Sequence, residues 1–148
     1  MRASLLRGFT LLELTVVIAI ALLLTGIAVP LIGDRLPGMK FNSAIHRIAT
    51  HARLARNIAI SSNTPVRLII DVGGRHYRLS VEPEGHSLPE EFTISLYAPR
   101  VEQLNDQVGA ILFYGDGSSS GGRVTISDGA RQRSVDVQWL TGRVSILE

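Results

Sequence analysis

The chain of 148 residues contains no cysteine and only one tryptophan. Without cysteine it can form neither a disulfide nor a thiolate metal site, so packing alone must hold its folded part together. It also lacks a nucleophile elbow, paired carboxylates, a Ser-His-Asp pattern and any repeat of 20–50 residues. We therefore expect neither an enzyme nor a repeat protein.

The sequence also has no net charge when its first residues, which carry Arg2 and Arg7, are left out of the count. The sequence has 15 Lys and Arg residues against 13 Asp and Glu residues, a formal charge of +2. Arg2 and Arg7 precede the first long apolar run, and without them 15 − 2 = 13 basic residues face 13 acidic ones. A neutral chain of this kind does not demand a polyanionic partner, so we do not expect nucleic acid.

What the sequence does have is a long apolar run, Leu14 to Ile32, without a charged residue. Its 19 residues would make a helix about 29 Å long at ~1.5 Å per residue, enough to cross a bilayer core. We expect a transmembrane helix over residues 9–33, kinked by Pro30. The arginines before it place the start of the chain in the cytoplasm, because positive flanks stay inside.

Glu13 is the unusual residue of this segment, because a carboxylate near the start of a membrane span needs a partner. It lies four residues after Phe9, and Gly8 precedes that phenylalanine. Cleavage after Gly8 would create a free amine on Phe9, which is a suitable partner for Glu13. An ordinary signal peptide would instead show an A-x-A site, for which Thr25–Ala28 is a poor substitute.

This arrangement resembles the class III signal of type IV pilins and pseudopilins. In that family a short basic leader ends in glycine, the mature chain begins with a methylated phenylalanine, and glutamate is its fifth residue. The resemblance implies that residues 1–8 are a leader removed by a prepilin peptidase. The same enzyme would methylate the new N-terminus at Phe9, and Glu13 would pair with that amine within one subunit or between neighbours.

A second helical pattern covers residues 34–63, where apolar residues recur with the spacing of one helix face. The members of this face are Phe41, Ala44, Ile45, Ile48, Ala52, Ala55 and Ala59. Their small size predicts close approach to a sheet. Leu54 and Ile58 lie off this face, and they are either minor core contacts or a second stripe that contacts another subunit.

Residues 64–148 show the pattern of short strands separated by turns. We expect strands at Val66–Asp71, Tyr77–Val81, Phe92–Tyr97, Ala110–Tyr114, Arg123–Ile126, Ser134–Trp139 and Val144–Leu147, with Glu82–Glu91 as a polar loop and Pro99–Val108 irregular. Gly73-Gly74 predicts a hairpin. The expected fold class is α+β: a long N-terminal helix, transmembrane and then amphipathic, followed by an antiparallel β-sheet or β-sandwich domain.

The C-terminal half carries a second resemblance, in the segments FYGDGSSSGGRVTI and DVQWLTGRVSI. They are similar to the H-type minor pseudopilins of type II secretion, the GspH/FimT family, although Gly115 replaces the usual proline. The resemblance implies a structural subunit at or near the tip of a pseudopilus that drives protein export across the outer membrane. The alternative is a FimT/FimU-like minor pilin that binds DNA for uptake, with Arg131, Arg133 and Arg143 as its basic patch.

Partners and location follow from the same resemblance. They are the prepilin peptidase and N-methyltransferase, the other minor pseudopilins, the major pseudopilin, and the bacterial inner membrane. The chain would cross that membrane once and place its C-terminal domain in the periplasm.

The remaining candidates favour structure over chemistry. Gly115–Gly122 lacks the Lys-Ser/Thr of a phosphate loop and reads as a hairpin connection. Asp116, Asp128 and Asp136 do not form a contiguous calcium ligand set, and no histidine pair has metal spacing, so we assign neither metal nor cofactor. Trp139 is expected to pack the last hairpin on the core, with an interaction edge as the other interpretation.

Overall fold

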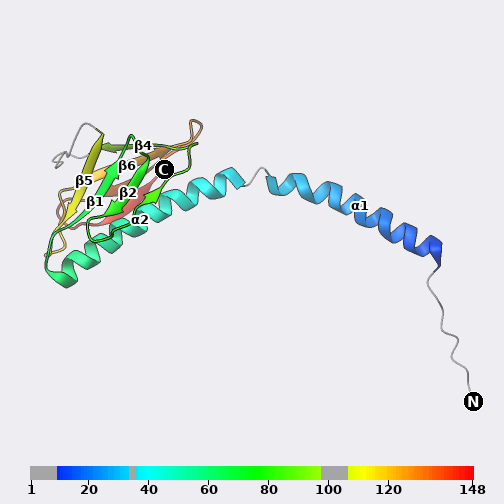
Figure 1. The fold of residues 1–148 in the computed structure, drawn as a ribbon, viewed down its shortest axis with the longest axis horizontal. Helices are drawn as coiled ribbons and strands as arrows, with labels where there is room; N and C mark the ends of the chain where they lie inside the picture. Colours follow the sequence, from blue (N-terminus) through cyan, green and yellow to red (C-terminus); the bar gives the residue numbers. More distant parts are fainter. Residues whose placement is uncertain (1–9, 34–35, 98–106) are drawn as a thin grey trace, which may run out of the picture. The chain divides into compact units, whose positions relative to one another are not determined.

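The computed structural model describes residues 10–33, 36–97 and 107–148 (Figure 1). The chain divides into two compact units, Met1–Met39 and Lys40–Glu148, and the second is called the globular unit below. Two helices come first, α1 (Leu11–Gly33) and α2 (Leu36–Ser62). The first helix therefore continues past Pro30 to Gly33, and the kink expected at that proline stays a prediction.

Eight strands follow in two antiparallel sheets of four strands each. The first sheet has the order β3-β2-β1-β5, from β1 (Val66–Asp71), β2 (His76–Leu79), β3 (His86–Ser87) and β5 (Val108–Phe113). The second has the order β4-β6-β7-β8, from β4 (Thr93–Tyr97), β6 (Gly122–Ser127), β7 (Gln132–Val137) and β8 (Val144–Leu147). The predicted α+β class, with antiparallel sheets after the helix, is confirmed.

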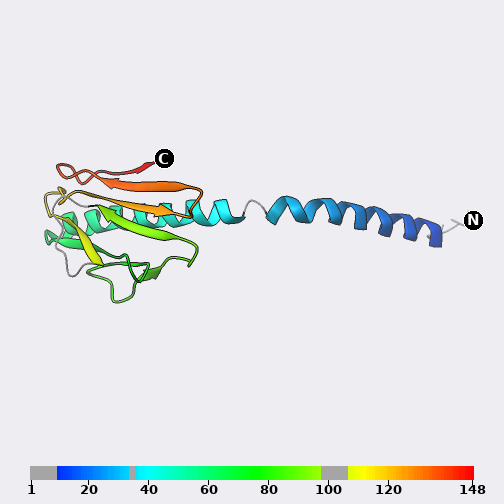
Figure 2. The same cartoon turned by 90° about the horizontal axis from the view of Figure 1, so that it is seen from above.

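The predicted apolar face of α2 is the centre of the core. All of its predicted members are at most 1% exposed, and Ala49 joins them. They form one buried cluster with alternate residues of both sheets, such as Leu68 of β1 and Val124 of β6. The strands of both sheets lie on the same side of α2 in Figure 1 and spread across its axis in Figure 2, so a single helix face can serve both sheets. Alanine side chains allow this approach because they add little bulk between helix and strand.

The strands β1 and β8 have the predicted bounds, and β4, β5 and β6 differ from theirs by one or two residues at their ends. Three other predictions need a larger correction. The expected strand Tyr77–Val81 ends at Leu79, because the chain turns there and the Glu82 N–H donates to the Leu79 carbonyl over 3.1 Å. Within the expected loop Glu82–Glu91, His86 and Ser87 form β3 on the edge of β2. A strand of two residues has no periodicity that the sequence could display.

The third correction concerns Ser134–Trp139. The strand β7 ends at Val137, and Trp139 belongs to the connection that follows it. The Gln138 N–H donates to the Arg143 carbonyl over 2.9 Å, which closes this connection. The ladder therefore ends before the tryptophan.

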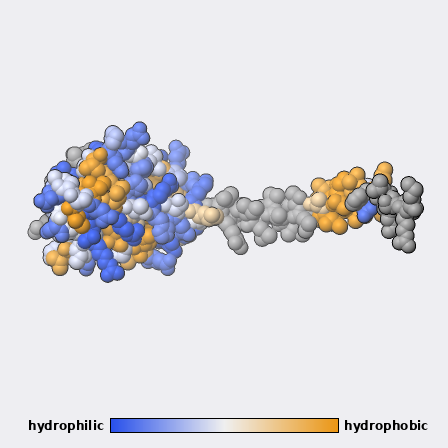
Figure 3. All heavy atoms as spheres, turned by 90° about the horizontal axis from the view of Figure 1, so that it is seen from below, coloured by the Kyte–Doolittle hydropathy of each residue, from blue (hydrophilic) through white to orange (hydrophobic). Residues whose placement is uncertain are grey.

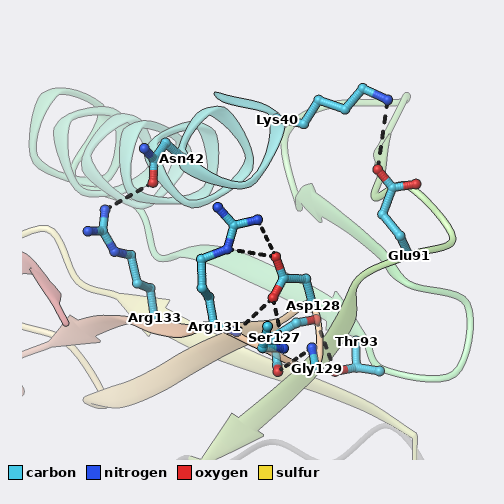
Figure 4. A network of polar contacts seen from close by, with 10 residues as sticks. Lys40, Asn42, Glu91, Thr93, Ser127, Asp128, Gly129, Arg131 and Arg133 are labelled. Carbon is cyan, nitrogen blue, oxygen red and sulfur yellow. Dashed lines mark hydrogen bonds and ion pairs between the residues drawn. The ribbon is translucent and has the colours of Figure 1, made fainter. Parts of the chain in front are cut away.

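A polar network joins the β6–β7 turn to the start of the globular unit (Figure 4). Asp128 accepts the N–H groups of Ala130 and Arg131 over 3.1 and 2.7 Å, and its other oxygen accepts the Arg131 guanidinium. The side-chain hydrogen bond from Arg131 is the main reason why the pKa of Asp128 is lowered. The same guanidinium lies over the Phe41 ring, 5.1 Å from its centroid. The interpretation of Asp128 as a turn residue is consistent with these bonds.

The face of α2 can be tested with two arginine substitutions. We expect Ala52→Arg to lower the free energy of unfolding by about 1–3 kcal/mol or more, because it overpacks the core and buries a charge. The matched control is Asn57→Arg on the exposed side of α2, which should change it by less than about 0.5 kcal/mol. Denaturant melts of a protein that begins at Asp34 measure both. If Ala52→Arg and Asn57→Arg had the same free energy of unfolding, the alanine face would not be packed as described.

Candidate functional site

The described residues begin inside the candidate processing signal. Gly8 and Phe9 lie outside the described residues, whereas Thr10 and Glu13 are at the first turn of α1. The Glu13 N–H donates to the Thr10 hydroxyl oxygen over 3.2 Å. Thr10 thus caps the helix and Glu13 occupies its third position, the spacing of a capping box. The carboxylate also lies at the positive end of the helix dipole, which favours its charge.

The side chains of α1 are strongly apolar and unburied over the part that can be described. Leu11, Leu12, Leu22 and Leu23 are 68–81% exposed. Figure 3 shows this surface as almost continuously hydrophobic, in contrast to the mixed surface of the globular unit. When the described residues alone are searched, no helix combines the length and hydropathy that a membrane crossing requires.

The two candidates of the second stripe on α2 behave differently. Ile58 is partly buried and packs on the core cluster, whereas Leu54 is 39% exposed. Ile58 therefore makes a minor core contact, which is the first of the two interpretations given for these residues. Leu54 remains available to a partner.

The glycine- and serine-rich segment Asp116–Gly121 links the two sheets. The Ser120 N–H donates to Leu112 of β5 over 2.8 Å, and the Ser119 N–H donates to the Trp139 carbonyl over 2.8 Å. The Ser119 hydroxyl donates to Gln138 over 3.1 Å and accepts the Gly121 N–H over 3.0 Å. The serines therefore bond to the protein backbone, which agrees with a structural connection and differs from a phosphate loop.

Arg56 of α2 fastens this segment to the β7–β8 connection. Its Nε–H is shared between the carbonyl oxygens of Gly117 and Thr141, each 3.0 Å away. Gly142 has φ +60°, and a Cβ there would overlap the Gly117 carbonyl, so glycine is required. No local sequence pattern indicates this role, because Arg56 is 61 and 85 residues from its two partners.

Trp139 is 66% exposed, so its predicted packing on the core is wrong. The β7 ladder ends two residues earlier, and the serine segment binds the backbone carbonyl of Trp139. Tyr97 and Leu140 are 74% and 63% exposed. Trp139 and Tyr97 line a hollow of about 1070 Å³ together with β5 and the serine segment. The other interpretation, an interaction edge, remains open.

The basic and acidic candidates are largely engaged with each other. Arg131 pairs with Asp128, and Arg133 donates to Glu148 over 2.6 Å and to Asn42 over 3.1 Å. Asp136 accepts from Arg123 over 3.0 Å, and Asp116 accepts the Ser118 N–H and hydroxyl, which lowers its pKa. These aspartates thus have structural partners of their own.

Histidines that no sequence spacing connects come together in the fold. His51 of α2 lies beside His86 of β3, with ring centroids 4.3 Å apart, and both rings contact Tyr77. Glu82 is close to both histidines. Spacing along the chain does not connect His51 and His86, because this group forms only between a helix and an edge strand.

A helix followed by two antiparallel sheets is also the fold of two solved structures, one of a minor pseudopilin and one of a minor pilin. The minor pseudopilin EpsH of the Vibrio cholerae type 2 secretion system has a TM-score of 0.56 and 14% identity, covering 72% of this chain and 94% of that one. The type IV minor pilin FimU of Pseudomonas aeruginosa has a TM-score of 0.54 and 13% identity, covering 72% and 92%. At such identities the likeness shows the fold alone.

The sequence comparisons are more specific. Residues 44–142 match the family model described as Type II transport protein GspH. A relative named Type II secretion system protein H, from Xanthomonas campestris pv. campestris, is 40% identical over 143 residues, covering 94% of this chain and 82% of the relative. The chain therefore belongs to the GspH family of type II transport proteins, and the predicted resemblance is confirmed.

The role of Arg56 can be tested with Arg56→Met, which keeps an apolar stem and removes the donor. Two carbonyl groups would lose a charged partner, so we expect the free energy of unfolding to fall by about 1–3 kcal/mol. Arg53→Met is the matched control, because within the described part of the chain the Arg53 guanidinium donates to a single carbonyl, that of Val144 at 3.5 Å. Urea melts compare them. Equal small losses in both variants would contradict the role of Arg56.

Proposed function

We propose that this protein is a minor pseudopilin, a structural subunit built at or near the tip of the pseudopilus of a type II secretion system. The observation that carries the proposal is the 40% identity to a type II secretion system protein H over 94% of the chain. Its work would be mechanical, because a subunit in a fibre that pushes cargo outward needs stable packing and no catalytic group. Its partners would be the other minor pseudopilins and the major pseudopilin.

The N-terminal segment supplies the proposed attachment to the inner membrane. Residues 1–8 would be the leader, cleaved by the prepilin peptidase, and α1 would lie in the membrane with the globular unit in the periplasm. Two features support this: the uncharged run of 19 residues from Leu14 to Ile32, and the exposed leucines of α1, which in water would be unfavourable. The prepilin peptidase would also methylate Phe9.

We propose that Glu13 sets the register between neighbouring subunits during assembly. Its position at the third residue of α1 brings its carboxylate to the end of the helix at which the Phe9 amine would lie after cleavage. In an apolar surrounding an unpaired carboxylate is costly, so a subunit whose Glu13 meets an amine would be favoured over one that does not. Leu54 would add a contact from the globular unit.

The alternative of a DNA-binding minor pilin gains no support from the proposed basic patch. Two of its three members, Arg131 and Arg133, already have carboxylate partners in Asp128 and Glu148. A phosphate would have to displace those partners, which weakens the attraction on which DNA binding depends.

The processing site makes the first prediction of this proposal. Mass spectrometry of the membrane-bound protein should show an N-terminus at Phe9 that carries a methyl group. Gly8→Val should leave the full-length chain uncut, because the peptidase requires the small residue before the cleaved bond. An unprocessed Met1 terminus in the unaltered protein, or cleavage after Ala28, would contradict the proposal.

The charge of Glu13 can be separated from its place in the helix cap. Glu13→Gln keeps a side chain suited to a capping box but removes the charge, whereas Thr10→Val removes the cap and keeps the charge. We expect Glu13→Gln and Glu13→Val to remain inserted but to co-purify about tenfold less partner pseudopilin, which corresponds to about 1.4 kcal/mol. Protein secretion by cells that carry these variants should fall as well. Normal assembly in Glu13→Gln and a defect in Thr10→Val would assign the residue to capping alone.

The exposed residue of the second stripe gives a third test. Leu54→Arg should leave the melting of the globular unit within about 0.5 kcal/mol of the original, because the side chain is exposed, but should reduce pull-down of the other minor pseudopilins. Thr50→Arg, also exposed on α2, is the matched control and should retain binding. Unchanged pull-down in both variants would remove Leu54 from the assembly surface.

A further inference from the structure

A group of three potential metal ligands lies between α2 and the edge of the first sheet, separate from the residues proposed for processing and assembly. It consists of His51 on α2, Glu82 in the turn after β2, and His86 on β3. One ligand atom from each residue lies within 4.8 Å of the others. Two imidazoles and one carboxylate are the protein ligands of many tetrahedral zinc sites, in which water or another group takes the fourth position.

His51 is already oriented as a metal ligand would be. Its Nδ1 lies 2.8 Å from the carbonyl oxygen of Arg47, one helical turn earlier. A carbonyl can only accept, so Nδ1 carries the proton and Nε2 carries the lone pair. A hydrogen bond of this kind, from the other ring nitrogen to a backbone carbonyl, fixes the tautomer and ring orientation of metal-bound histidines.

Glu82 supplies the second observation. Its Oε2 atom is buried and has no hydrogen-bond partner among the described residues. Removing a carboxylate oxygen from water without a partner is unfavourable, so its position calls for a cation or a donor. The backbone holds it in place, because its N–H closes the turn after β2.

His86 is fixed from the opposite side. It pairs with Tyr77 across the β2–β3 ladder, and its ring lies 5.3 Å from the ring of that buried tyrosine. The ring of His51 also lies 5.3 Å from Tyr77. The tyrosine thus forms an aromatic support on which both imidazoles rest, while His86 stays accessible to solvent.

We propose that His51, Glu82 and His86 bind one zinc-class divalent cation, which fastens the short edge strand β3 to α2. The soft preference of two imidazoles favours zinc over calcium or magnesium, which prefer oxygen ligands. Tetrahedral zinc at ~2.0–2.1 Å holds its ligand atoms about 3.4 Å apart. Because the ligand atoms lie within 4.8 Å of one another, they would approach by at most about 1.4 Å on binding. The fourth position would hold water or a group from a neighbouring subunit. The site is independent of the assembly role proposed above.

Zinc chloride added to the untagged, chelator-treated full-length protein in detergent tests the site. We expect one zinc per chain in a competition titration against a chelating dye. The folding equilibrium should favour the native state about 100-fold more when zinc is 100 times its Kd, seen as a higher Tm. Binding should weaken as the pH is lowered, because protons then compete with the metal for its ligand atoms.

Substitutions identify the ligands. His86→Gln and Glu82→Gln should weaken zinc binding at least tenfold while the Tm without zinc stays close to that of the unaltered protein. His46→Gln, an exposed histidine on α2 outside the group, should bind like the original. Cobalt in place of zinc should give a tetrahedral absorption band that these two variants lose. No zinc-dependent rise in Tm, or equal binding in all variants, would overturn the proposal.

Discussion

The close packing of α2 on two sheets is the constraint on which the rest of this fold depends. Five alanines of the helix, Ala44, Ala49, Ala52, Ala55 and Ala59, are fully buried, and they belong to one core with residues from both sheets. With no cysteine in the chain, this core must supply the stability that a disulfide would otherwise add. The serine segment and Arg56 depend on it, because α2 must be held close to both sheets for one guanidinium to bind both connections.

Features with a strong local period could be predicted from the sequence. The apolar face of α2 was recognised from its helical spacing, and β1 and β8 were found with their correct ends. Features that depend on long-range pairing could not. The edge strand β3 has two residues and exists only through its bonds to β2, and Trp139 was misplaced because nothing local marks where β7 leaves its ladder.

The same distinction applies to the candidate sites. The signal Gly8, Phe9 and Glu13 is a contiguous motif, so resemblance alone was enough to suggest it, and it remains a prediction. Arg56 and the group His51, Glu82 and His86 are formed by residues far apart in the chain, and their geometry only exists once α2 lies on the sheets. The DGSSSGG segment lies between these cases: it was recognised as a family motif, but its function as a bridge between sheets came from the bonds of Ser119 and Ser120.

Native-state hydrogen exchange of the globular unit, in a protein that begins at Asp34, tests the central role of α2 most directly. If one core unites the helix and both sheets, the slowest amides of α2, such as those of Ala52 and Ala55, should open with the same free energy as the slowest amides of β1 and β6. All three would then report global unfolding. Amides of α2 that exchange with a much lower free energy, while β1 and β6 stay protected, would contradict the account, because the sheets would then be stable without the helix.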